Sequence, residues 1–197
     1  SDGADIYLSD RRGGFRSVQR MSTPLAGYNL LEIADFSADG FLDVIMSNFQ
    51  GFPSVWMYPS VPSAGLQAPI HFDFSSVLSR PPSGITVADL DRDGRPDLVL
   101  ADTGRSSLDP KGIHIFYRGE GNQFREHKFL PLQGMYDRPG ALQVADIDGN
   151  GYPDIVFMIN SNDRMGYFLQ TESGFAQPMF QSTDDNPWTN SFYFDNS

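Results

Sequence analysis

Cysteine is absent from the 197 residues of the chain. A disulfide framework, a thiolate zinc site and a cysteine nucleophile are therefore excluded. Long hydrophobic runs are also missing: because no stretch reaches the roughly 18 apolar residues of a spanning helix, we expect no part of the chain to insert directly into a membrane.

Basic side chains are scarce, with 14 lysines and arginines against 25 aspartates and glutamates and a net charge of −11. Nucleic-acid binding needs a basic surface, so we expect no nucleic-acid partner. The acid is unevenly spread, since ten aspartates fall in three nine-residue windows, at residues 35–43, 89–97 and 146–154. One Ca²⁺ in each window would add six positive charges and bring the net charge from −11 to −5.

The three acidic windows belong to an internal repeat. The segments IADFSADGFLDVIM, VADLDRDGRPDLVL and VADIDGNGYPDIVF align without gaps, and their first aspartates are Asp35, Asp89 and Asp146. The periods are therefore 54 and 57 residues. Self-similarity at such a period is typical of repeat arrays and propellers.

Short apolar runs fill the sequence between the acidic windows. Around the second window they cover residues 98–102, 112–118, 124–130 and 141–147, bounded by Gly, Pro, Asp and Ser. Four strands per repeat without helical periodicity predict an all-β fold of propeller blades, each with four antiparallel strands. A β-sandwich also uses short strands, but it gives no reason for a repeated loop at a fixed position.

The repeats divide residues 1–197, which we expect to form a single β-propeller region. The predicted divisions are 1–32 (partial), 33–86, 87–143, 144–192 and 193–197 as the start of a further repeat. Three complete blades would thus have partial blades at both ends. A closed four-bladed ring would lack one strand, so a part of a larger propeller fits better.

Calcium chemistry explains the composition of the acidic windows, here called loops one, two and three, with positions counted from the first aspartate. Ca²⁺ takes about six to eight oxygen ligands. Side chains at positions 1, 3 and 5 of a curled loop converge, glycine at position 6 permits the turn, position 7 offers its carbonyl and position 9 closes the shell. The predicted ligands are Asp35, Ser37, Asp39, Phe41 and Asp43; Asp89, Asp91, Asp93, Arg95 and Asp97; and Asp146, Asp148, Asn150, Tyr152 and Asp154.

We expect about two or three bound Ca²⁺ ions, with loop one the weakest site because Ser37 replaces a carboxylate. An EF-hand is excluded, because its loop requires a glutamate at position 12, where this chain has Met46, Leu100 and Phe157. Metal-free Asx turns are the alternative. Repulsion among the inward-facing carboxylates favours a cation.

Enzyme signatures are missing. His71, His114 and His127 lie in strand-like runs without paired spacing, so we expect them to be structural or surface residues. No Gly-x-Ser-x-Gly elbow occurs, and calcium accounts for every dense aspartate cluster. The chain is therefore not expected to be an enzyme.

Candidate ligand contacts are few. Trp188 lies in a polar connection and is a weak candidate for contacting a sugar or a protein, with packing as the alternative. Trp56 and Tyr58 are expected to pack within a blade. The longer connections, at residues 59–69 and 132–139, are where binding specificity would reside.

The repeats resemble the FG-GAP/VCBS family, which forms the blades of integrin α-subunit heads, of many secreted microbial propellers and of fungal lectins. The resemblance rests on the Asp-x-Asp-x-Asp-Gly-x-x-Asp loop before an apolar strand, and on glycine-led turns before Phe15, Phe124 and Phe175. It implies a propeller of about seven blades with Ca²⁺ on the rim of one face. It does not identify a ligand.

Two functions remain open. One is a calcium-stabilised, non-catalytic recognition or adhesion module that binds a protein or carbohydrate through inter-blade loops. The other is an accessory propeller of a secreted hydrolase or lyase whose active site lies outside this chain; a purely structural array is a third possibility. Such loops would fill at extracellular calcium levels, which predicts an extracellular or cell-surface location. Self-association, or further blades, could complete the ring.

Overall fold

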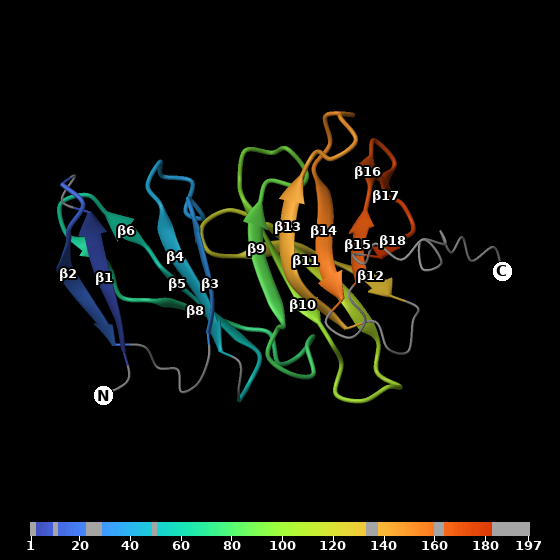
Figure 1. Ribbon diagram of the computed structural model, residues 1–197, viewed down its shortest axis with the longest axis horizontal. Helices are drawn as coiled ribbons and strands as arrows, with labels where there is room; N and C mark the ends of the chain where they lie inside the picture. Colours follow the sequence, from blue (N-terminus) through green and yellow to red (C-terminus); the bar gives the residue numbers. More distant parts are fainter. Residues whose placement is uncertain are drawn as a thin grey trace.

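A computed structural model describes residues 3–9, 12–22, 29–48, 51–132, 138–159 and 164–182. Within these ranges the chain forms β-strands joined by turns (Figure 1), which confirms the all-β prediction. The same ranges contain no helix long and apolar enough to cross a membrane.

Three four-stranded antiparallel sheets follow one another along the chain, as predicted for propeller blades (Figure 1). The first blade contains β3 (Asn29–Ala34), β4 (Asp43–Asn48), β5 (Ser54–Tyr58) and β8 (Ile70–Asp73). The second contains β9 (Gly84–Ala88), β10 (Asp97–Asp102), β11 (Lys111–Arg118) and β12 (Phe124–Leu132). The third contains β13 (Pro139–Ala145), β14 (Asp154–Ile159), β15 (Arg164–Phe168) and β18 (Met179–Ser182).

Smaller two-stranded sheets accompany the blades. A partial blade is formed by β1 (Gly3–Ser9) and β2 (Phe15–Ser22), and short hairpins are formed by β6 (Ser60–Val61) with β7 (Gly65–Leu66) and by β16 (Gln170–Thr171) with β17 (Gly174–Phe175). Gln19 of the partial blade contacts the first hairpin: its Nε2 donates to the Leu66 carbonyl at 2.9 Å, and its Oε1 accepts from the Leu66 amide at 3.0 Å. Residues 193–197, predicted to begin a further repeat, lie outside the described ranges.

The repeat divisions at residues 33, 87 and 144 fall inside the innermost strands β3, β9 and β13. Each sheet begins a few residues before the predicted division, because the aligned motif includes only the last residues of the first strand of each blade. Its earlier residues differ between repeats. The run predicted at residues 141–147 ends at Ala145, since Asp146 already begins loop three.

The blades pack face to face through apolar side chains. On β10, Leu98 and Leu100 belong to the cluster between the first and second blades, while Val99 and Ala101 belong to the cluster between the second and third. A strand that is covered on both faces has no polar alternation, which explains its continuous apolar run. The second blade is thus the shared core of the described structure.

The innermost strands approach one another most closely at a pair of glycines. A Cβ atom on Gly84 of β9 would overlap the backbone carbonyl of Gly140 on β13 and would lie 3.2 Å from Leu142 Cγ. A side chain at this point would therefore separate the second blade from the third.

Aromatic residues on β5 pack within the first blade, as predicted. Tyr58 is buried against Met46, and Trp56 packs beside them and stacks on the His71 ring with centroids 4.8 Å apart. Trp188 lies outside the described residues.

Candidate metal loops

The three loops share one backbone conformation, although their sequences differ. Position 4 is left-handed in each, with φ of 58°, 62° and 77° at Ala38, Arg92 and Gly149. Position 6 is left-handed as well, with φ of 89°, 85° and 86° at Gly40, Gly94 and Gly151. Glycine adopts this region without steric cost, whereas alanine and arginine adopt it only at a steric cost.

Position 4 allows a matched test of this backbone cost. Gly149→Ala should lower the free energy of unfolding by about 1 kcal/mol, because a Cβ there finds open space but an unfavourable φ. Ala38→Gly, the reverse change at the equivalent position, should raise it by a smaller amount. Urea unfolding in chelator measures both, and equal signs for the two changes would contradict a common loop conformation.

Position 1 caps the turn of each loop. In loop two, Asp89 Oδ1 accepts from the Asp93 amide at 3.0 Å, and Oδ2 accepts from the Gly94 amide at 2.9 Å. The same two amides, at positions 5 and 6, donate to Asp35 in loop one and to Asp146 in loop three. The Asx-turn bonds of the metal-free alternative are therefore present. Each carboxylate oxygen can accept more than one contact, so they leave room for a cation.

Position 9 joins the loop to the rest of its blade. Asp97 is fully buried (0% exposed); its Oδ2 accepts from the Leu90 amide and its Oδ1 from the Arg118 amide, both at 2.9 Å. Asp154 makes the same pair of bonds with Ile147 and Gln170. These aspartates connect the start of each loop to a residue at or just after the end of the blade's third strand.

Asp43 makes the corresponding bonds in loop one with one difference. It accepts from the Ser60 amide at 2.9 Å, but its second donor is the amide of Ser37 at position 3, not that of Phe36 at position 2. Loop one therefore differs from the others in which amide near its start donates to the position-9 aspartate, although its capping bonds at position 1 are the same.

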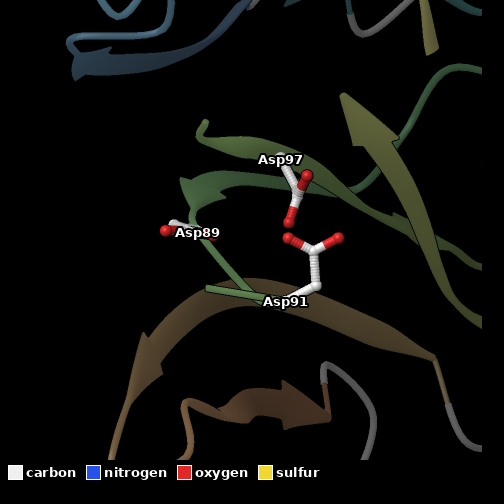
Figure 2. A group of neighbouring side chains, drawn as sticks. All are labelled: Asp89, Asp91 and Asp97. Carbon is white, nitrogen blue, oxygen red and sulfur yellow. The ribbon is translucent and has the colours of Figure 1, made fainter. Parts of the chain in front are cut away.

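The carboxylates converge in two of the three loops. Oxygen atoms of Asp89, Asp91 and Asp97 all lie within 4.8 Å of one another (Figure 2), and so do those of the equivalent aspartates of loop three, Asp146, Asp148 and Asp154. This is the donor chemistry that Ca²⁺ prefers. The predicted carbonyl ligands at Phe41, Arg95 and Tyr152 stay predictions.

Loop one does not bring three acidic groups together, although all of its residues are described. Serine replaces aspartate at position 3, and the buried Ser37 Oγ has no hydrogen-bond partner among the described residues. An oxygen without a partner fits a further ligand there. Loop one has as many aspartates as loop three, but they do not converge on one point. That loop one is the weakest site stays a prediction.

Burial raises the pKa of Asp97 to about 6, although the amides of Arg118 and Leu90 act in the opposite direction. The nearby charges of Asp89 and Asp93 raise the pKa further. Negative charge is therefore unfavourable at this point, and a cation in the loop would relieve the repulsion.

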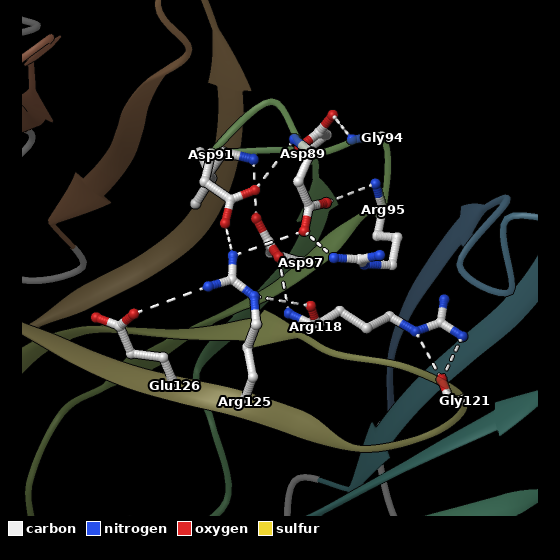
Figure 3. A network of polar contacts seen from close by, with 11 residues as sticks. Asp89, Asp91, Gly94, Arg95, Asp97, Arg118, Gly121, Arg125 and Glu126 are labelled. Atoms are coloured by element: carbon white, nitrogen blue, oxygen red, sulfur yellow. Dashed lines mark hydrogen bonds and ion pairs between the residues drawn. The ribbon is translucent and has the colours of Figure 1, made fainter.

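Two arginines reach the carboxylates of loop two (Figure 3), which the sequence did not reveal. Arg125 on β12 forms an ion pair with Asp91, and Arg95 Nη2 lies 2.5 Å from Asp93 Oδ2. In the second blade, Phe124 pairs with Arg118, and Arg125 is the residue after Phe124. The corresponding pairs in the other two blades are followed by Gln67 and by Ala176. Of the three blades, only the second therefore has a basic residue at this position.

A glutamine connects loops two and three. Gln170 donates its amide to Asp154 at 2.7 Å, and its carbonyl accepts from Asn150 Nδ2 at 2.8 Å. Its side-chain Nε2 reaches across to the Leu90 carbonyl of loop two at 3.0 Å. Hydrogen bonds thus run from the buried aspartate of one loop to the next loop.

Two of the three histidines lie side by side in the structure. His114 Nδ1 lies 2.9 Å from His127 Nε2, and His114 Nε2 lies 3.7 Å from Asp102 Oδ2. Their separation of 13 residues gave no signal, because cross-strand neighbours on β11 and β12 depend on register. The His114 ring packs on Phe116 and Phe129, which fits the predicted structural role.

A family model described as an FG-GAP-like repeat matches the chain twice, at residues 35–100 and 89–157. Each match begins at a candidate metal loop and ends on the second strand of the following blade, and together the matches cover more than half of the chain. No curated protein matches the chain.

Proposed function

Because the chain belongs to the FG-GAP-like repeat family, we propose that it is a calcium-stabilised, non-catalytic recognition or adhesion module that acts outside the cell. The observation that carries this proposal is the repeated convergence of three aspartates, in loops two and three, on one equivalent point of two successive blades. Repulsion between such carboxylates is costly without a cation.

Calcium would be held by Asp89, Asp91 and Asp97 in loop two and by Asp146, Asp148 and Asp154 in loop three. The ion supplies positive charge and ties together the two strands that flank the loop. The buried aspartates already link each loop to the third strand of its blade. Calcium therefore stabilises a framework that these residues preorganise.

Recognition is supported by exposed apolar side chains at the opposite ends of the blades. Phe52 is 79% exposed and Leu108 is 90% exposed, and both lie between the second and third strands of their blades. Antiparallel topology places these connections away from the metal loops, as Figure 1 shows for the first and second blades. Apolar tips on a rigid scaffold suit contact with a protein partner; a carbohydrate remains the other candidate.

The decisive experiment is a thermal melt in chelator followed by a Ca²⁺ titration, with Mg²⁺ as the control ion. At Ca²⁺ about 100-fold above the dissociation constant, one filled loop adds about 3 kcal/mol, which corresponds to a midpoint increase of about 5–10 °C. Half-saturation far above micromolar Ca²⁺ would support an extracellular location.

The control protein carries Asp91→Asn and Asp148→Asn, which remove one charge from each loop but keep its buried aspartate. Its midpoint should respond much less to Ca²⁺. If the unmodified chain melts at the same temperature with and without Ca²⁺, the loops are metal-free turns, and both the calcium role and the inferred location are wrong.

A further inference from the structure

Loop two has more acidic residues than the other loops, and it also holds positive charge of its own. Its four aspartates at positions 1, 3, 5 and 9 are accompanied by Arg95 at position 7 and by Arg125 from β12 (Figure 3). These four aspartates and the two arginines that pair with them sum to −2. Arg92 at position 4 adds a third positive charge to the loop, but no ion pair among the described residues joins it to these carboxylates. The number of carboxylates alone therefore overstates how strongly this loop attracts a cation.

Arg125 is held in place over the loop. Its Nη2 forms the ion pair with Asp91 and lies 3.6 Å from Asp93 Oδ2. Its Nε donates to the Arg118 carbonyl at 3.2 Å, and its guanidinium lies 5.5 Å from the centre of the Tyr117 ring. A guanidinium fixed at several points loses little further freedom when it pairs with a carboxylate.

Arg95 contributes a second contact from within the loop. Its Nη2 pairs with Asp93 Oδ2, while the Asp93 Oδ1 accepts from the Arg95 amide at 2.9 Å. Both carboxylates that face the arginines are partly exposed, so each ion pair is weaker than a buried one. Of the two arginines, Arg125 contacts Asp91, one of the three converging aspartates.

Loop three lacks this arrangement. Among the ion pairs between described residues, none involves Asp146, Asp148 or Asp154, which leaves a net charge of −3. Tyr152 stands where loop two has Arg95, and Ala176 stands where the second blade has Arg125.

One cation does approach loop three, but not its carboxylates. Arg92 stacks on the Tyr152 ring at 3.9 Å and lies 3.5 Å from the Gly151 carbonyl. The side chain that contacts Asp148 is the neutral amide of Asn150, at 3.1 Å. The aspartates of loop three therefore have no cationic partner among the described residues.

We propose that Arg125 competes with Ca²⁺ for loop two, so that loop three binds calcium first although it has one aspartate fewer. The inference rests on the proposed function. A guanidinium paired with Asp91 brings positive charge to a carboxylate that a metal ion would use, so repulsion between the two cations opposes calcium binding. At low calcium Arg125 also offsets part of the negative charge of loop two, whereas the aspartates of loop three depend on the ion for this.

Amide NMR spectra resolve the loops one by one, with Gly94 reporting on loop two and Gly151 on loop three during a Ca²⁺ titration. In the unmodified chain we expect Gly151 to saturate at lower Ca²⁺ than Gly94. Arg125→Gln should lower the dissociation constant seen at Gly94 about tenfold and leave that at Gly151 within about twofold. Arg125→Lys, which keeps the charge but loses the fork, should give a smaller gain.

Arg20→Gln is the matched control, because it removes one positive charge and one surface pair, with Asp5, from the partial blade. It should change neither constant. If the Arg125→Gln protein unfolds in chelator, two results still test the competition. They are the calcium affinity of the Arg125→Lys protein and the order in which the two loops saturate in the unmodified chain. Unchanged affinity at Gly94 in the Arg125 variants, with both loops filling together, would overturn the competition but leave calcium binding intact. No response at either glycine in any protein would instead remove the proposed function.

Discussion

Asp97→Ala is expected to lower the free energy of unfolding by about 4 kcal/mol, because it leaves two buried backbone donors without partners. Asp97 is fully buried and accepts from the amides of Leu90 and Arg118. The loss should persist in chelator, because those hydrogen bonds do not involve a metal ion. Urea unfolding in chelator measures the stability lost with these hydrogen bonds, and urea unfolding with Ca²⁺ measures any further loss of stabilisation by the ion.

Asp91→Ala is the comparison that separates the two roles of the loop. Asp91 is exposed, and its carboxylate accepts from the Asp93 amide and pairs with Arg125. In chelator this change should cost about 1 kcal/mol or less. If Asp97→Ala proved no more costly than Asp91→Ala in chelator, Asp97 would be a metal ligand without a structural role of its own.

Gly84→Ala should cost about 3 kcal/mol, because the added methyl group meets a backbone carbonyl that no rotamer change can move. The obstacle is the Gly140 carbonyl on the innermost strand of the third blade, with Leu142 Cγ beside it. Relief requires the second and third blades to shift apart, which would loosen the core cluster between them. The urea unfolding midpoint measures the loss.

Gly121→Ala is the control for Gly84→Ala. Gly121 has φ of 63°, but a Cβ there has no neighbour within 4 Å, so only the backbone conformation opposes the change. We expect a cost of about 1 kcal/mol. If the two alanines proved equally costly, the close approach of the innermost strands would be wrong.

The repeat explains why much of the fold could be predicted from the sequence. Strand β11, Lys111–Arg118, matches the predicted run at residues 112–118 to within one residue, because a short run of β-branched and aromatic residues lies between turn residues. The left-handed glycines at position 6 occur where the motif requires them. Within a loop, chemistry and conformation are set by neighbouring residues, which a single sequence displays.

Contacts between distant strands could not be predicted in the same way. Asp91 and Arg125 are 34 residues apart, and the Gln170 side chain reaches the Leu90 carbonyl across 80 residues. His114 and His127 meet only because of the register between β11 and β12. Such pairs depend on how strands align and how one blade is placed beside the next, and no local pattern reports either.

The residue at or just after the end of the third strand has a consequence for how this array could grow by duplication. Gln170 and Arg118 each reach back to position 2 of the preceding loop, the glutamine to the Leu90 carbonyl and the arginine to the Phe36 ring at 4.6 Å. Every residue offers a backbone carbonyl, so a duplicated blade with the glutamine could make this hydrogen bond to any preceding blade. A copy with the arginine would gain its cation–π contact only behind a blade with an aromatic residue at position 2. Copies that carry different residues at this point would therefore not suit every neighbouring blade equally.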